Sequence, residues 1–291
     1  MINFHKYGFL DAKKLLKYVE NGNYWICRYN PIWLFIWSDK YKPEIAFDND
    51  YCYIRFLMPD IGMCYYPPLG NSDISKGIKQ IKKDAFENGF DLNMAPIDER
   101  LIDELLSQNF DVKPNESFSS YIYNCDDLAF FNKLKKKKKI LKKFEKLNPS
   151  AYYRPIKKED FPQILEFIEN WHLSNKLIEG YNYYAKLNSI KKLIDHLYEF
   201  DLTGIMLVVE DKICGLAIGS IYANMAYLHL NIYLDEPIGS KEVLISSFAK
   251  IAILKARYLN LEEDLNILEL KNELLEYKPL KIEKFYSTFR L

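Results

Sequence analysis

Short apolar runs alternate with turn residues through the first hundred residues of this chain. Three runs are rich in β-branched and aromatic residues and are separated by Asp, Asn and Gly, which predicts antiparallel strands at residues 45–47, 52–57 and 63–66. At residues 74–87 the apolar positions recur at helical spacing and Gly89 follows, which predicts an amphipathic helix. The same patterns predict helices at residues 11–20 and 98–108 and a strand at residues 91–95.

A second series of elements begins near residue 118. We predict strands or extended segments at residues 118–124, 152–155, 205–210, 213–222, 227–234 and 279–285. Helices are predicted at residues 160–173, 190–200, 240–258 and 265–275. A long helix is predicted from Asp126 to Asn148, because Pro149 cannot continue a helix.

Residues 213–234 carry no charged side chain and are long enough to span a bilayer. Asn224, His229 and Asn231 interrupt this stretch, and polar side chains are costly in hydrocarbon. Two runs of β-forming residues around a break at residues 223–225 predict a buried hairpin instead.

The second series reads strand, two helices, three antiparallel strands, helix, strand, helix, strand. This order is typical of a GNAT-type acyltransferase unit, and the first series has a rough version of the same order. We therefore predict an α+β fold of two tandem GNAT-like (acyl-CoA N-acyltransferase fold) units, each with a mixed, mostly antiparallel sheet flanked by helices. The predicted domains are residues 1–125 and residues 126–291, and the second opens with a lysine-rich helix.

Charge and cysteine content narrow the function classes. The 291 residues include 40 basic and 40 acidic side chains, so the net charge of zero excludes a uniformly basic nucleic-acid binder and an acidic, solvating chain. The N-terminus lacks an uncharged apolar run and a cleavage site, so we expect no secretory signal. Five scattered cysteines without a CxxC pair argue against a zinc site or disulfide framework and favour reduced thiols in a cytoplasmic protein.

The zero net charge conceals a local polycation. Residues 133–146 contain nine Lys and one Glu, a net charge of +8. Such a helix can neutralise several phosphates of tRNA or of an anionic headgroup without reading base sequence. The alternative is a solvated helix face. Its many lysines then reflect the composition of the whole chain, in which 34 of the 40 basic residues are Lys. The candidate anion-binding residues are Lys133, Lys136, Lys137, Lys138, Lys139 and Lys143.

Candidate catalytic groups cluster in the second half. Glu262 and Asp264, with Asn260, can deprotonate or bind an attacking amine, or they can simply cap the helix predicted at residue 265. His229 lies centrally on the last hairpin strand, where it is either a proton-transfer group or a core histidine. Tyr277 can protonate a leaving group or pack at a helix end.

A helix start directly after the hairpin offers a phosphate site. Gly239, Ser240 and Lys241 open the helix predicted at residue 240, and helix N-terminal amides bind phosphates. GNAT enzymes hold the coenzyme A pyrophosphate at this place with a Q/R-x-x-G-x-G/A pattern. Only Gly239 can be placed on that pattern, which argues mildly against coenzyme A and for a larger donor.

Four segments in order resemble the family of the C-terminal domain of phosphatidylglycerol lysyltransferase, which is related to the Fem-type aminoacyltransferases. They are residues 120–144 with the Ser-Tyr-Ile-Tyr run and the lysine helix, residues 155–171, the hairpin with His229, and residues 260–279 with Lys271. The chain departs from the family pattern at several polar positions. Lys139 stands where the family has Asn, Leu261 where it has Arg, and Asn231 and Ile232 where it has Glu-Lys.

The resemblance implies a tandem GNAT fold and an activated-acyl transferase, in the best-known relatives one that takes an aminoacyl group from charged tRNA. It implies His229, Asn260 and Asp264 as the transfer site, Lys271 as a substrate contact, and no permanently bound cofactor. Aminoacyl-tRNA or acyl-CoA is then the donor, tRNA the leading polyanion partner, and a small molecule or lipid headgroup with an amine or hydroxyl the acceptor. Membrane contact would be at most peripheral. An acetyl-CoA N-acetyltransferase and a non-catalytic anion-binding or RNA-binding protein remain alternatives, and the sequence leaves the oligomeric state open.

Overall fold

We describe the chain from a computed structural model, which covers residues 2–20, 22, 24–70, 73–174, 183–265 and 267–289. The chain divides into two compact units. Unit 1 comprises Met1–Ser120, Glu263–Lys271 and Ile282–Leu291, and unit 2 comprises Tyr121–Glu262 and Asn272–Lys281. This partition differs from the expected cut between residues 125 and 126, because two C-terminal segments are grouped with unit 1.

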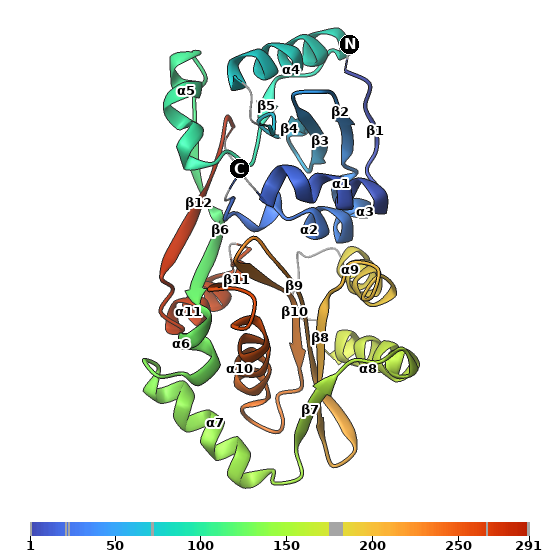
Figure 1. Ribbon diagram of the computed structural model, residues 1–291, viewed down its shortest axis with the longest axis vertical. Coiled ribbons are helices and arrows are strands. Elements are labelled where there is room, and N and C mark those ends of the chain that lie inside the picture. Colours follow the sequence, from blue (N-terminus) through green and yellow to red (C-terminus); the bar gives the residue numbers. More distant parts are fainter. Residues whose placement is uncertain are drawn as a thin grey trace. The chain divides into compact units, whose positions relative to one another are not determined.

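Unit 1 contains a five-stranded sheet in the order β1-β2-β3-β4-β5 (Figure 1). The strands are β1 (His5–Lys6), β2 (Glu44–Phe47), β3 (Cys52–Met58), β4 (Gly62–Tyr65) and β5 (Asn93–Met94). The helices are α1 (Phe9–Glu20), η1 (Cys27–Tyr29), α2 (Pro31–Ile36), α3 (Ser38–Tyr41), α4 (Ile74–Asn88), η2 (Glu99–Leu101) and α5 (Ile102–Ser107). The three predicted antiparallel strands and the amphipathic helix are confirmed, and the Asp98 side chain caps the helical segment that follows it.

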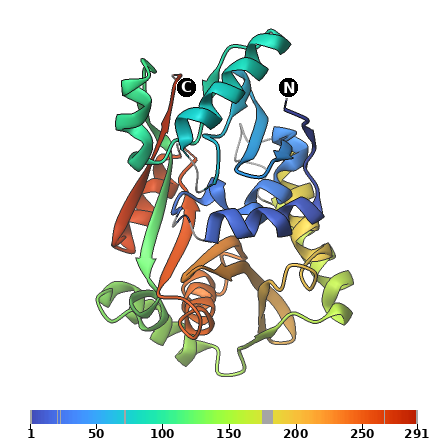
Figure 2. The same ribbon diagram turned by 45° about the horizontal axis from the view of Figure 1, so that its top comes forward.

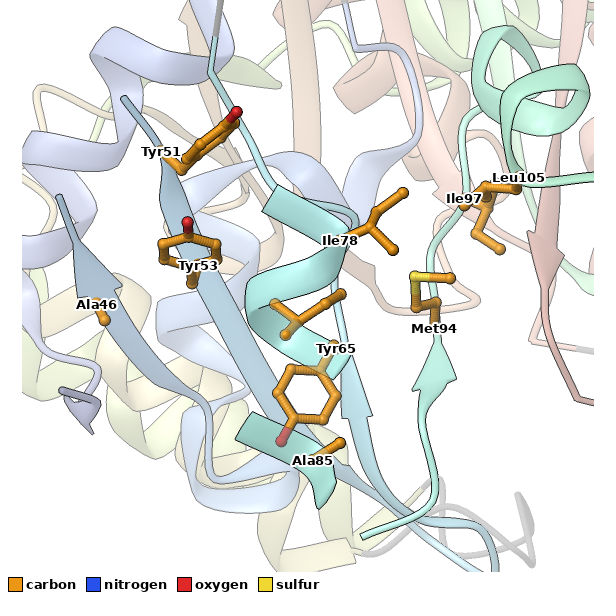
Figure 3. Close-up of a cluster of buried hydrophobic side chains, with 10 residues drawn as sticks. Ala46, Tyr51, Tyr53, Tyr65, Ile78, Ala85, Met94, Ile97 and Leu105 are labelled. Carbon is orange, nitrogen blue, oxygen red and sulfur yellow. The ribbon is translucent and has the colours of Figure 1, made fainter. Parts of the chain in front are cut away.

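The core of unit 1 forms where α4 crosses the sheet. Ile78, Ile81 and Ala85 of α4 meet aromatic side chains of β3 and β4 and Met94 of β5 in one buried cluster (Figure 3). Because α4 connects β4 to β5 and these strands pair in parallel, the helix is a crossover that covers one sheet face. The helical spacing of apolar residues that predicted α4 therefore also predicted which of its faces is buried.

A seven-stranded sheet has the order β12-β6-β11-β10-β9-β8-β7. Its strands are β6 (Lys113–Asn124), β7 (Tyr152–Pro155), β8 (Thr203–Val209), β9 (Lys212–Tyr222), β10 (Met225–Tyr233), β11 (Tyr258–Glu263) and β12 (Lys281–Ser287). The associated helices are α6 (Cys125–Phe130), α7 (Lys135–Leu147), η3 (Lys158–Asp160), α8 (Phe161–Ser174), α9 (Tyr183–Asp195), α10 (Ser240–Ala252) and α11 (Leu268–Glu276). The charge-free stretch at residues 213–234 forms the antiparallel pair β9–β10, as predicted. Within the described residues, no helix is both long and apolar enough to cross a membrane.

The two units repeat one motif. In unit 1 the antiparallel strands β2, β3 and β4 are followed by α4 and then by β5, which pairs in parallel with β4. In unit 2 the antiparallel strands β8, β9 and β10 are followed by α10 and then by β11, which pairs in parallel with β10. Figures 1 and 2 both show α10 lying against β8–β10. This repeat is what two tandem units of one fold require.

Helix predictions were wrong in extent at several places, and the helix expected at residues 190–200, for instance, runs from Tyr183 to Asp195. The helix expected from residue 126 to 148 is two helices, α6 and α7, because Phe131 adopts a left-handed backbone conformation with φ 47°. The helix expected from residue 240 to 258 ends at Ala252, and Tyr258 already begins β11. The latter two errors arose because periodicity of apolar residues reports burial and does not register a local break in the backbone.

Candidate functional site

Strands β10 and β11 pair only over their first residues. Their parallel ladder runs from Met225/Tyr258 to Tyr227/Asn260. Just beyond it, the register between β10 and β9 shifts between Leu228 and Leu230, which makes His229 the extra residue of a bulge. The end of the parallel ladder and the bulge therefore coincide, and they direct the His229 side chain toward the end of β11.

Three polar side chains form a row across β9, β10 and β11, which we call the His229 row. His229 Nδ1 lies 2.7 Å from Glu262 Oε1, and His229 Nε2 lies 2.8 Å from Ser220 Oγ. A carboxylate only accepts hydrogen bonds, so Nδ1 carries the proton that it donates to Glu262. The Nε2 atom of a neutral imidazole is then an acceptor, so the Ser220 hydroxyl donates to it.

Asn260 holds the backbone at Glu262. The Glu262 amide donates to Asn260 Oδ1 at 2.7 Å, a local turn two residues long. This turn accommodates the left-handed conformation of Glu262, whose φ is 64°. A non-glycine residue in this conformation costs on the order of 1–3 kcal/mol and persists where its surroundings hold it in place. Glu262 is thus fixed twice, through its backbone by Asn260 and through its carboxylate by His229.

The row is open only at its carboxylate end. Ser220 is 3% exposed and the His229 side chain is 0% exposed, whereas the Glu262 side chain is 17% exposed. Among the described residues, His229 is the only partner recorded for the Glu262 carboxylate, through Oε1. Gly219 faces α10, since an added Cβ would lie 2.5 Å from Phe248 Cζ, so the neighbouring Ser220 lies on the other sheet face. Of the three side chains in the row, Glu262 is therefore the one that reaches solvent, and the row lies on the sheet face opposite α10.

Tyr277 belongs to a different group of residues, which we call the α10 cluster. Lys137 Nζ lies 3.3 Å from Glu242 Oε1 and 2.9 Å from Glu276 Oε2, and it sits 4.5 Å from the centre of the Tyr277 ring. The Tyr277 hydroxyl is 3.5 Å from Glu242 Oε1. Burial, with the Glu242 charge beside it, raises the pKa of Tyr277 well above its usual value, which opposes ionisation at neutral pH. The hydrogen bond from Lys137 lowers the pKa of Glu276.

The start of α10 is covered by α7. Gly239 has φ 105°, and a Cβ added there would lie 3.1 Å from both Ile140 and Phe144 of α7. The Ser240 hydroxyl donates to the carbonyl of Pro237. Lys241 forms an ion pair with Glu273, and burial lowers the pKa of Lys241 to about 8. The predicted phosphate site thus has a helix packed on it and the Glu242 carboxylate in its first turn.

Helix α7 turns most of its lysines outward. Lys137 and Phe144 are buried, and Ile140 and Leu141 are half-buried on the same side. On the opposite side, at spacings of four, three and four residues, lies an exposed set that we call the lysine stripe: Lys135, Lys139, Lys142 and Lys146. Like charges at these spacings repel by about 0.2–0.5 kcal/mol per pair, which a bound polyanion would relieve.

The remaining predicted residues are spread over the chain. Lys136 and Lys143 are exposed, Lys138 is half-buried and bonds to Asn132, and Lys133 pairs with Asp127. Asp264 is buried within unit 1, where its carbonyl accepts from Ile267, and Lys271 is half-buried on α11. The structure therefore brings together His229, Glu262 and Asn260 within unit 2, and it places Tyr277 and Lys137 in the α10 cluster instead.

Two side-chain interactions were not predicted from the sequence, one made by Ser220 and one between Arg28 and Glu263. Ser220 was not predicted, because a single Ser in an apolar strand carries no signal until the fold places it beside His229. The second is a fully buried ion pair in unit 1, in which Arg28 Nε lies 2.6 Å from Glu263 Oε1 although the residues are 235 positions apart. Arg is rare in this chain, and this rarity was the one feature of the sequence that suggested a specific role for Arg28.

Comparisons with known proteins identify a family that matches most of the chain. The family described as "Phosphatidylglycerol lysyltransferase, C-terminal" matches residues 25–288. A search of curated proteins found no match.

Solved structures match over almost the whole chain. A conserved protein of unknown function from Bacteroides thetaiotaomicron has a TM-score of 0.92 at 21% identity, covering 99% of both chains. L-PGS from Bacillus licheniformis has a TM-score of 0.69 at 13% identity, covering 97% of this chain and 92% of that one. FemX has a TM-score of 0.64 at 7% identity, covering 99% and 95%. At these identities the likeness concerns the fold, and it confirms the predicted α+β architecture of two tandem GNAT-like units.

Proposed function

Because this chain belongs to the phosphatidylglycerol lysyltransferase C-terminal family, we propose that it is an aminoacyltransferase of the lysyltransferase or Fem-like type. It would transfer an acyl or aminoacyl group to an amine or hydroxyl acceptor. The observation that carries the proposal is the Glu262 carboxylate, which His229 holds by one oxygen at the point where β10 and β11 cease to pair. In GNAT-like units, the strand that bears His229 lines the acyl cleft.

In the proposed reaction, Glu262 accepts a proton from the attacking group. An amine or hydroxyl attacks the carbonyl carbon of the aminoacyl ester, a new C–N or C–O bond forms, and the ester bond to the 3′ oxygen of the tRNA breaks. The attacking group loses a proton, which Glu262 Oε2 accepts, and the carboxyl group then returns this proton to the leaving 3′ oxygen. A partly buried carboxylate with one oxygen fixed and the other open to substrate suits this role.

We propose that the donor is a molecule other than coenzyme A, because the start of α10 is already covered. In an acetyl-CoA enzyme the start of this helix would hold a pyrophosphate, but here Ile140 and Phe144 of α7 lie against Gly239. The Glu242 carboxylate already satisfies the positive end of the helix dipole and would repel a phosphate. Since α7 also displays the lysine stripe, the arrangement favours a large polyanionic donor such as aminoacyl-tRNA, bound outside α7. We propose that the protein works in the cytoplasm on a small molecule or on a lipid headgroup, with at most peripheral membrane contact.

Binding of tRNA measured against salt concentration tests the lysine stripe. Replacing Lys135, Lys139, Lys142 and Lys146 with Gln is expected to reduce the slope of log affinity against log salt by about 3. Each lysine that no longer neutralises a phosphate leaves roughly 0.7–0.9 counterions on the tRNA. The matched control replaces four exposed lysines of α4 with Gln, at Lys76, Lys79, Lys82 and Lys83, and loses the same net charge. An equal reduction in both variants would mean that α7 is no specific tRNA surface.

Replacement of Glu262 tests the transfer step. Lysyl-tRNA labelled in its lysyl group is incubated with the protein and phosphatidylglycerol vesicles, or with a protein-free metabolite extract, and the labelled product is counted. We expect Glu262→Gln to lower the transfer rate by about 100-fold, because the amide accepts no proton at neutral pH.

Glu210→Gln is the matched control. It also lies at positive φ in unit 2, but in an exposed turn, and it should leave the rate unchanged. Labelled tRNA that binds but never loses its lysyl group to either acceptor source would identify a non-catalytic anion-binding protein instead.

A further inference from the structure

The His229 row contains the three groups of a serine-hydrolase triad, yet their exposure is reversed. A nucleophilic serine must meet the substrate, and its histidine and carboxylate lie behind it. Here Ser220 is 3% exposed, the His229 side chain is fully enclosed, and the Glu262 side chain is 17% exposed. The carboxylate is the end that reaches the substrate, so Ser220 is the innermost member of the row and not its reacting group.

We infer that Ser220 is a positioning residue for Glu262 and acts through His229. This inference rests on the proposed function, in which Glu262 is the reacting carboxylate. Both ring nitrogens of His229 are engaged, Nδ1 by Glu262 and Nε2 by Ser220, so the imidazole is held at both ends of the ring. Any proton that His229 exchanged with a substrate would have to pass through one of these two partners.

The hydrogen bond from Ser220 has a clear mechanical effect. It provides a hydrogen-bond donor for the buried Nε2 atom of His229. It also limits rotation of the imidazole ring about the Cβ–Cγ bond. The Nδ1–H group then points at Glu262 Oε1 in one direction only. With Oε1 held in this way, the carboxylate cannot rotate, and Oε2 alone faces the substrate.

The strand architecture explains why this support is needed. Glu262 adopts a strained left-handed backbone at the end of β11, where the parallel pairing with β10 has ceased. Ser220 lies on β9 in the regular part of the sheet, paired with Tyr227, which in turn pairs with Asn260. The row therefore transmits the rigidity of three paired strands to a residue that lies just outside their ladder.

A double-mutant cycle separates this role from a general loss of structure. Ser220→Ala alone is expected to lower kcat by about 10-fold with little change in KM, as outer-shell partners of histidines do. In a Glu262→Gln background, Ser220→Ala should cause no further loss, because the reacting carboxylate that it positions has been removed. Ser220→Thr keeps the hydroxyl and should restore most of the activity. Ser246→Ala also removes a buried hydroxyl, one that donates to the Ala129 carbonyl, and it should leave kcat unchanged.

Nuclear magnetic resonance provides a readout that needs no donor or acceptor. The Nδ1 proton of His229 should be slow to exchange and shifted downfield in the wild type, in Ser220→Thr and in Ser246→Ala, and lost to exchange with water in Ser220→Ala. With four histidines in the chain, the signal is assigned by replacing His229 itself.

Three results would overturn the inference. These are losses that multiply in the double mutant, an unchanged Nδ1 proton in Ser220→Ala, and an acyl group found on Ser220 by peptide mass spectrometry after incubation with lysyl-tRNA. If no transfer is detected at all, the proposed function fails, and the Nδ1 proton still decides whether Ser220 positions the His229–Glu262 contact.

Discussion

Arg28→Met is expected to lower the free energy of unfolding by about 3–5 kcal/mol, the largest effect of any single substitution proposed for this chain. The guanidinium binds Glu263 through two nitrogens, at 2.6 and 3.1 Å, and both side chains are 2% exposed. Phe118 and Trp33 close over the guanidinium at 4.1 and 5.0 Å from their ring centres. Removing Arg28 therefore leaves the Glu263 carboxylate buried beside aromatic rings without the guanidinium that binds both of its oxygens.

Urea denaturation followed by circular dichroism measures this loss. The double variant Arg28→Met with Glu263→Gln should recover a large part of it, because the buried charge is then gone as well. Glu44→Gln is the matched control in unit 1, since the Glu44 side chain is 36% exposed and its partner Arg55 keeps Asp84, and its replacement should cost less than about 1 kcal/mol. A loss for Arg28→Met as small as that of the control would contradict the argument.

Lys137→Met is expected to lower the free energy of unfolding by about 3 kcal/mol and to leave the salt dependence of tRNA binding unchanged. Lys137 and Glu242 have side chains 11% and 9% exposed, and the substitution removes the ion-pair partner of Glu242 in the first turn of α10. A lysine stripe residue should behave in the opposite way, with a reduced salt slope and unchanged stability. The helix would thus have one face for stability and one for binding.

The control for this second substitution is Lys133→Met. Lys133 pairs with Asp127 but is 71% exposed, so its loss should cost less than about 1 kcal/mol. Adding Glu242→Gln to Lys137→Met should restore much of the lost stability. If Lys137→Met instead reduced the salt slope as strongly as a stripe residue, Lys137 would have to be accessible to the polyanion, against its buried position in the structure.

The local pattern of apolar residues was sufficient to predict an element wherever buried positions repeat with the period of a strand or a helix. The antiparallel strands β2–β4 and β8–β10 and the amphipathic helix α4 are all confirmed. These features depend on neighbours within a few residues of each other, and a single sequence contains that information. The element order then led to the tandem GNAT-like fold.

Helix ends and the inward position of Lys137 did not follow from the sequence. The run of five lysines has no amphipathic signal of its own, and it is Ile140 and Phe144, one turn further on, that fix which side of α7 faces α10. Phe131 breaks the expected long helix by adopting a left-handed conformation, which non-glycine residues seldom do and apolar periodicity does not register.

By itself, the sequence determined the elements, the repeated order, the local charge of +8 and the family, because each of these depends on local patterns or on their order along the chain. Only the tertiary structure decided which polar groups lie in contact. It joined Ser220, His229 and Glu262 across three strands, separated Tyr277 from them, and paired Arg28 with a glutamate 235 residues away. A hydrogen bond depends on a distance of about 3 Å in space, and separation along the chain carries almost no information about that distance.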